Sequence, residues 1–226
     1  MFQLRNANLH TNISDLSKLP DGKLRINTIN AYSYNTTYKD PDFAAALKCG
    51  DILLPDGVSI VKACRWLRAK SQPQRRITGW DLFSIEMSRL EAKACQEEDF
   101  HPTVMFVGST EHTLSLIQKN ASGEYPHLRV KTYSPPFVSS FTAEESQAIV
   151  DTINETDPDL LWIGMTAPKQ EKWAYSHWSE LNIHCHCGTV GAVFDFFAGT
   201  RPRAPKWWQD HSLEWLYRLF IEPRRM

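Results

Sequence analysis

The stretch Leu160-Leu161-Trp162-Ile163-Gly164-Met165-Thr166-Ala167-Pro168-Lys169-Gln170-Glu171-Lys172-Trp173 decides the fold. It begins with a short apolar run, which is typical of a buried strand. A loop containing glycine and proline follows, and then a polar string of the kind that starts a helix. The stretch therefore predicts a strand that leads through a loop into a helix.

Further strands and helices of this kind are expected on both sides of that unit. Apolar runs predict strands at residues 24–29, 51–54, 103–107 and 183–187, besides 160–163. Helical spacing predicts helices at residues 42–47, 58–68, 81–96, 111–118 and 143–154, and loops are expected at 71–74, 120–126 and 134–140. This alternation predicts an α/β fold, with a mainly parallel sheet flanked by helices.

Composition narrows the class of protein. The 226 residues are 42% hydrophobic, which suits one medium-sized domain. With 25 basic and 26 acidic residues, the chain lacks the global positive field of a nucleic-acid-binding protein. The five cysteines are an odd number, and only Cys185 and Cys187 lie close together, which argues against a secreted disulfide framework and for the reducing cytosol. We expect no signal peptide and no membrane span, so any membrane contact would be peripheral.

The last 26 residues differ from the rest. Residues 1–200 are expected to form the α/β domain, and residues 201–226 a short helical appendage with six basic and three acidic residues. Its aromatic and basic side chains suit a helix lying among lipid headgroups. An ordinary helix packed on the core would show a similar apolar stripe, and both interpretations stay open.

Asp56 is the candidate catalytic residue. It follows the strand at 51–54, within Leu53-Leu54-Pro55-Asp56-Gly57. Ligands of open α/β sheets bind beyond the carboxyl ends of the strands, so Asp56 would project from the ligand-binding edge. A positioned carboxylate there is a natural general base for an attacking hydroxyl. The alternative is a turn residue that bonds its own backbone.

Two glycine turns are candidates for holding phosphates. Gly108 and Gly164 each end a predicted strand, and free N–H groups beyond them would suit a diphosphate, although helix capping alone explains such turns equally well. After Gly164, Lys169 would counter a pyrophosphate and Gln170 would bond a sugar hydroxyl or a uracil edge. Alternatively this segment is a capped helix start, with Glu171 and Lys172 as surface charges.

Apparent metal motifs do not support a metal. In His184-Cys185-His186-Cys187, alternation along a strand would send the two histidines to one face and the two cysteines to the other. Asp157-Pro158-Asp159 precedes its strand and so lies at the wrong edge. Asp195, among aromatic residues, is either a capping or ion-paired residue or a ligand of the donor. We expect no metal and no cofactor.

Seven motifs together resemble the WecG/TagA/CpsF glycosyltransferase family. They occur in the family's order and cover nearly the whole chain. The motifs are Thr28-Ile-Asn30-Ala, Leu54-Pro-Asp56-Gly57, Arg76-Ile-Thr-Gly79-Trp-Asp81-Leu82, Ala167-Pro-Lys-Gln170-Glu-Lys-Trp173, Phe194-Asp-Phe-Phe-Ala-Gly199, Arg203-Ala-Pro-Lys-Trp207 and Leu213-Glu-Trp-Leu-Tyr-Arg-Leu219.

The resemblance implies a Rossmann-like domain of the GT-E type and an inverting, metal-independent hexosyltransferase. The implied donor is a UDP-sugar, and the implied acceptor is a sugar on undecaprenyl diphosphate, used for surface polysaccharide, capsule or teichoic acid. The enzyme would be cytoplasmic and peripheral on the inner face of the cell membrane. A homo-oligomer in solution is left open.

The resemblance also implies roles for individual residues. By motif, Asp56 matches the catalytic base, and four residues match pocket positions: Thr28, Asn30, Arg76 and Gln170. The appendage would bring arginines over the donor phosphates, and the matching candidates are Arg218, Arg224 and Arg225. Two alternatives remain at this point, a nucleotide-binding oxidoreductase or regulator and a membrane-associated scaffold. The absence of G-x-G-x-x-G counts against the oxidoreductase.

Overall fold

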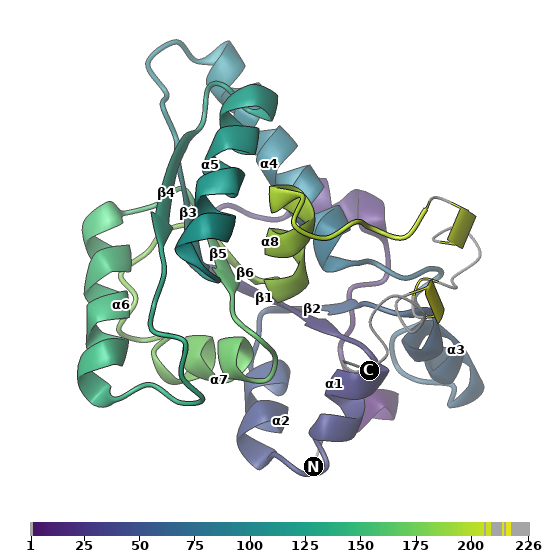
Figure 1. The fold of residues 1–226 in the computed structure, drawn as a ribbon. Coiled ribbons are helices and arrows are strands. Elements are labelled where there is room, and N and C mark those ends of the chain that lie inside the picture. The colour runs from purple at the N-terminus through teal and green to yellow at the C-terminus, as the bar shows by residue number, and fades with distance from the viewer. Residues whose placement is uncertain (1, 206, 209–213, 215, 218–226) are drawn as a thin grey trace.

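The computed structural model describes residues 2–205, 207, 208, 214, 216 and 217 (Figure 1). Six strands form one sheet: β1 (Leu24–Ile29), β2 (Ile52–Pro55), β3 (Thr103–Gly108), β4 (Arg129–Tyr133), β5 (Leu160–Gly164) and β6 (His186–Thr189). The helices before β3 are the short 3-10 helices η1 (Leu4–Asn6) and η2 (Ile13–Lys18), then α1 (Ala31–Thr36), α2 (Pro41–Lys48), α3 (Val58–Trp66) and α4 (Gly79–Gln96). The later helices are α5 (Glu111–Glu124), α6 (Ala143–Thr156), α7 (Lys169–Ser176) and α8 (Gly191–Ala198).

The sheet has the order β2-β1-β6-β5-β3-β4, and every pairing is parallel. Successive side chains of a strand point to opposite faces, so β5 must be apolar throughout to be covered on both sides. Trp162 packs with α4, α5 and α8, whereas Leu161 and Ile163 pack with α6 and α7. The two helical layers are visible in Figure 1. This confirms the predicted α/β class and its parallel sheet.

Trp162 fits into the sheet because its neighbour on β6 is a glycine. Gly188 is its register partner, and a Cβ built on Gly188 would lie 2.3 Å from the indole ring. The ring is fully buried in the larger core. Close packing of this kind explains why β6 is poor in large apolar residues.

Several boundaries differ from the sequence predictions. β4 was not predicted, because an edge strand that is partly exposed lacks an apolar run. The segment at 120–126, expected as a loop, largely continues α5, where Asn120 donates to Phe197 O at 2.7 Å. β6 begins at His186, three residues later than residue 183. Short helices α1 and α8 also follow β1 and β6.

In the part of the chain that the structure describes, no helix is both long enough and apolar enough to cross a bilayer.

Candidate active site

Asp56 lies where the carboxyl ends of β1 and β2 meet. Thr28 pairs with Leu54 across these strands, so Asp56 stands just beyond the paired residues. Its backbone N–H donates to Ile29 O at 2.8 Å, which anchors the residue to the end of β1. Asp56 and Thr28 are both half-buried. The two predicted site residues are therefore brought together at the ligand-binding edge of the sheet.

Asn30 comes directly after β1 and starts α1. Its carboxamide oxygen accepts from Ser33 N at 2.9 Å and from Ser33 Oγ at 3.2 Å. The cap uses the oxygen, so the amide NH₂ is the part of Asn30 suited to donating to a ligand. A Cβ on Gly57 would lie 3.8 Å from Asn30 Cβ, which shows how closely Asn30 approaches the turn after Asp56.

Arg76 reaches the same edge from the segment before α4. Ile77 N donates to Pro55 O at 3.0 Å, so Arg76 lies beside the end of β2. Its guanidinium Nη1 is 3.1 Å from Glu214 Oε2, and the side chains are 22% and 10% exposed, respectively. Glu214 belongs to the appendage, which therefore contacts a predicted site residue. Sequence reasoning quoted Glu214 within a motif but gave it no role.

The start of the appendage also packs on the domain. The Arg203 guanidinium carbon lies 4.8 Å from the centre of the Trp80 ring, and Ala204 is buried. These contacts support the interpretation of a docked segment, and membrane contact stays a prediction. Arg218, Arg224 and Arg225 lie outside the described residues.

Gln170 is buried in the first turn of α7. Its Nε2 donates to Glu171 Oε1 at 2.8 Å. A Cβ on Gly191 would stand 2.8 Å from Gln170 Oε1, so Gln170 lies against the start of α8, directly after β6. Because β6 lies beside β1, this places Gln170 one strand away from the group formed by Thr28, Asn30 and Asp56.

The alternative interpretation of this segment as a capped helix start made Glu171 a surface charge, and the structure contradicts that part of it. The residue is 2% exposed, and burial raises its pKa to about 7 against the opposing effect of the Gln170 amide. A carboxyl group with this pKa holds its proton through mildly acidic pH. No pattern in the sequence distinguishes the buried Glu171 from a charged residue at the surface of a helix.

Lys169 ties two loops together. Its ammonium group donates to Val138 O at 2.5 Å and lies 3.5 Å from the centre of the Phe141 ring. Partial burial lowers its pKa. The contacts join the start of α7 to the loop after β4, and its role as a counter-charge for pyrophosphate stays a prediction.

Gly108 and Gly164 are partners at the ends of β3 and β5. A Cβ on Gly108 would lie 2.4 Å from Gly164 O, and Gly108 has φ +122°. The helices that follow, α5 and α7, pack on opposite faces of the sheet. In α/β proteins, a crevice for ligands forms where the chain leaves two neighbouring strands toward opposite faces of the sheet. Thr110 caps α5 by accepting from Thr113 N at 3.2 Å, and phosphate binding there stays a prediction.

Asp195 is ion-paired. Its Oδ2 lies 3.2 Å from Arg201 Nε, and its side chain is 26% exposed. This supports the ion-pair interpretation, while a role in binding the donor stays a prediction.

The two apparent metal motifs have structural roles among the described residues. His186 starts β6, whereas His184 is exposed before it, so the prediction that both share one strand face was wrong. Cys185 and Cys187 are buried together in the core beside α6 and α7. Asp159 accepts from Thr103 N at 2.7 Å, and Asp157 ends α6, so both residues lie at the amino edge as expected.

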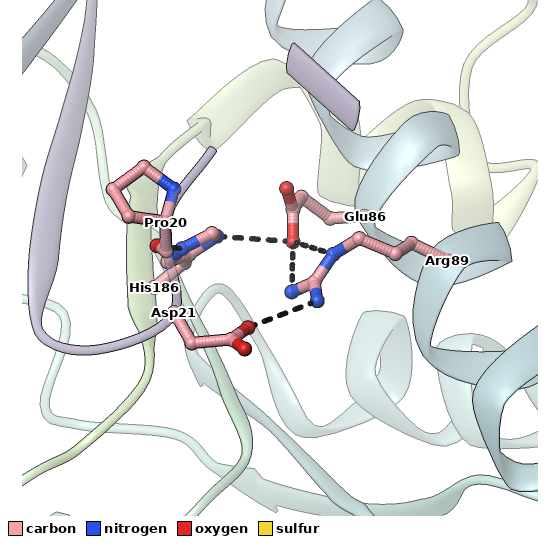
Figure 2. A network of polar contacts seen from close by, with 5 residues as sticks. All are labelled: Pro20, Asp21, Glu86, Arg89 and His186. Carbon is pink, nitrogen blue, oxygen red and sulfur yellow. Dashed lines mark hydrogen bonds and ion pairs between the residues drawn. The ribbon is translucent and has the colours of Figure 1, made fainter. Parts of the chain in front are cut away.

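His186 joins the buried polar network in Figure 2. Its Nδ1 lies 3.1 Å from Glu86 Oε2, and the same oxygen is 2.8 Å from Arg89 Nη2. Burial alone would raise the pKa of Glu86 and lower that of His186. Their mutual contact, together with Arg89 beside Glu86 and the Pro20 carbonyl beside His186, outweighs burial, so the pKa of Glu86 is lowered and that of His186 is raised. The pair fastens α4 to the start of β6.

Comparison with known families decides the class of this site. A family model described as "Glycosyl transferase WecG/TagA/CpsF family" matches residues 3–226. The chain belongs to the WecG/TagA/CpsF family. It is therefore an enzyme of the hexosyltransferase class, and the oxidoreductase and scaffold hypotheses are set aside.

The chain is also similar to curated proteins from two Bacillus species. A Bacillus subtilis (strain 168) protein is 28% identical over 223 residues, which cover 97% of this chain and 81% of the relative. A Bacillus spizizenii protein is 27% identical over 188 residues, covering 83% and 67%. Both are named N-acetylglucosaminyldiphosphoundecaprenol N-acetyl-beta-D-mannosaminyltransferase.

Proposed function

We propose that this WecG/TagA/CpsF protein transfers a hexosyl group from a UDP-sugar to a sugar carried on undecaprenyl diphosphate. The observation that carries the proposal is the position of Asp56, anchored to the end of β1 beside Thr28 and Asn30. The names of both relatives support N-acetylglucosaminyl-diphospho-undecaprenol as the acceptor and N-acetylmannosamine as the transferred sugar. The product would feed a surface polymer.

The proposed reaction is a single in-line displacement with inversion. Asp56 takes the proton of the acceptor hydroxyl as its oxygen bonds to the anomeric carbon. The bond from that carbon to the diphosphate oxygen breaks, and UDP leaves from the opposite face. Thr28 and the NH₂ of Asn30 lie at the carboxyl edge of the sheet, where they would orient the acceptor. Gln170 lies at the same edge and would orient the donor.

Charge on the leaving diphosphate must be stabilised. Preorganised donors at a site that excludes water are the most effective way to do this without a metal. The backbone beyond Gly108 and Gly164 lies where the chain leaves the paired strands β3 and β5 toward opposite faces of the sheet, which suits a diphosphate. The appendage, which reaches Arg76 through Glu214, would bring Arg218, Arg224 and Arg225 to the same region.

The acceptor would be met at the membrane surface. A long-chain polyprenyl diphosphate stays in the bilayer, so the enzyme would act as a peripheral protein on the inner face of the cell membrane. Aromatic and basic side chains of residues 201–226 suit that contact. The remaining protein would be cytoplasmic.

A substrate screen tests the proposal. The full chain is incubated with a panel of UDP-sugars and a short-chain analogue of undecaprenyl-diphosphate-GlcNAc, with and without EDTA, and products are read by mass spectrometry. We expect one added hexosyl unit from a UDP-sugar, UDP-N-acetylmannosamine being the first candidate, and no loss with EDTA. Transfer to free sugars but not to the lipid diphosphate, or loss with EDTA, would contradict the proposal.

A further inference from the structure

A cluster of potential metal ligands lies away from the candidate active site. Glu91, Cys95 and His127 each offer one ligand atom, and these atoms lie within 4.8 Å of one another. His127 Nδ1 is 2.6 Å from Glu91 Oε1 and 3.3 Å from Cys95 Sγ. The imidazole nitrogen therefore points between the carboxylate and the thiol.

The fold builds this cluster from separate elements. Glu91 and Cys95 are four residues apart on α4, so they share one face of its last turns. His127 lies in the turn between α5 and β4, and its backbone N–H donates to Glu91 Oε2 at 3.2 Å. The C-terminal ends of α4 and α5 lie together in Figure 1. β4, which follows α5, and β2, which precedes Asp56, are the two opposite edge strands of the sheet.

We propose that Glu91, Cys95 and His127 bind a divalent transition metal of the zinc class. Thiolate, imidazole and carboxylate are the ligand types that Zn²⁺ takes in tetrahedral sites. Bond lengths of about 2.0–2.3 Å place tetrahedral ligand atoms roughly 3.3–3.6 Å apart. The 3.3 Å between His127 Nδ1 and Cys95 Sγ matches this spacing, and the 2.6 Å between His127 Nδ1 and Glu91 Oε1 would lengthen as the metal replaces the hydrogen bond. On binding, the thiol releases its proton to solvent, and the imidazole binds as a neutral ring through Nδ1, with its one proton on Nε2.

The exposure of the three side chains indicates how the metal would enter the site and what its fourth ligand would be. The side chain of Glu91 is 16% exposed and that of His127 is 50% exposed, and Cys95 is also exposed. The metal would enter from solvent and keep a water in its fourth position. It would join the end of α4 to the turn before β4, and so stabilise the edge strand without touching the reaction.

Cobalt binding tests the proposal directly. The full chain, stripped with EDTA and kept reduced, is titrated with Co²⁺, and Zn²⁺ then competes. We expect one Co²⁺ per chain with a thiolate-to-cobalt charge-transfer band, which Cys95→Ser abolishes and His127→Gln weakens at least tenfold in affinity. Cys49→Ser removes another exposed cysteine and should leave the band unchanged.

Thermal unfolding gives a second measurement. Zn²⁺ at about 100 times Kd should raise Tm by about 5–10 °C in the wild type and not in Cys95→Ser. Without metal the two proteins should melt alike, which shows that the variant folds. No binding, binding without the charge-transfer band, or a band that survives Cys95→Ser would overturn the proposal. Turnover after EDTA treatment should be unchanged, since the cluster is remote from Asp56.

Discussion

Arg76, just before α4, and Glu214, in the C-terminal segment predicted as an appendage, form an ion pair with 3.1 Å between Nη1 and Oε2. The two residues are 138 positions apart in the chain. Since Arg76 lies beside the end of β2, this contact makes the appendage part of the candidate site. Docking of residues 201–226 onto the domain would then depend on whether Arg76 is paired with Glu214.

Glu214→Gln is predicted to lower kcat/KM for the lipid-linked acceptor by about tenfold, which corresponds to about 1.4 kcal/mol. The loss lies between the value of an exposed ion pair, about 0–1 kcal/mol, and that of a broken buried pair, about 3–5 kcal/mol. Steady-state kinetics would measure it, with Glu98→Gln as an exposed control. Equal kcat/KM in the two variants would show that the contact does not serve the site.

His186→Gln is predicted to destabilise the fold most in mildly acidic solution. The pKa of Glu86 is lowered from 4.5, so its contribution is complete above about pH 4.5 and falls as pH drops through the folded-state pKa. The pKa of His186 is raised from 6.5, so its contribution is complete below about pH 6.5 and is lost as pH rises through the folded-state pKa.

Urea unfolding of wild type and His186→Gln measures this difference. We expect a loss of about 3–5 kcal/mol near pH 5.5, the scale of a broken buried pair, and a smaller loss near pH 8.5. His177→Gln is the control, because its contact with Glu180 is more exposed and should contribute about 0–1 kcal/mol. A loss independent of pH would mean that packing, rather than charge, explains the effect.

Glu171→Gln is predicted to stabilise the protein above neutral pH. The pKa of Glu171 is raised from 4.5 to about 7, so wild-type stability falls as pH rises from the unfolded value to the folded value. The neutral amide removes that cost, which amounts to about 3 kcal/mol. Denaturant unfolding at about pH 5 and 8 checks the sign, and a variant less stable at both values would refute it.

Gly188→Ala is predicted to destabilise the fold, because the added methyl group would meet the Trp162 ring at 2.3 Å. Overpacking of this kind costs about 1–3 kcal/mol. Gly123→Ala is the matched control in α5, where a Cβ meets nothing within 4 Å. Alanine there should stabilise the helix by up to about 1 kcal/mol. Melting temperatures that move in the same direction would contradict the packing argument.

Strand prediction from sequence succeeded where burial leaves an apolar run. β5, at residues 160–164, is buried on both faces and was found, whereas β4, at residues 129–133, lies at the edge and was missed. β6 was placed too early because its buried residues include His186 and Gly188. His186 can be buried in this strand because it pairs with Glu86, and Gly188 is needed because the Trp162 ring lies against it. Both partners are distant in the chain.

Site prediction followed the same limit. Asp56 was predicted from the rule that ligands bind beyond the carboxyl ends of parallel strands, whereas Thr28 and Asn30 came from the resemblance to the family. All three residues lie at one edge of the sheet, and their roles stay predictions. Glu214 and the buried state of Glu171 depend on tertiary packing that no local pattern encodes. The cluster of Glu91, Cys95 and His127 was missed for the same reason, since only the first two are close in sequence.

Asp56→Asn is the most direct test of the account. The amide keeps the shape of the side chain but cannot take the proton from the hydroxyl of the acceptor sugar. The rate of sugar transfer in a single turnover should therefore fall at least ~100-fold. UDP binding and Tm should stay as in the wild type, and Asp42→Asn, at an exposed carboxylate, should transfer normally. Transfer by Asp56→Asn at a near-normal rate would contradict the assignment of Asp56 as the base.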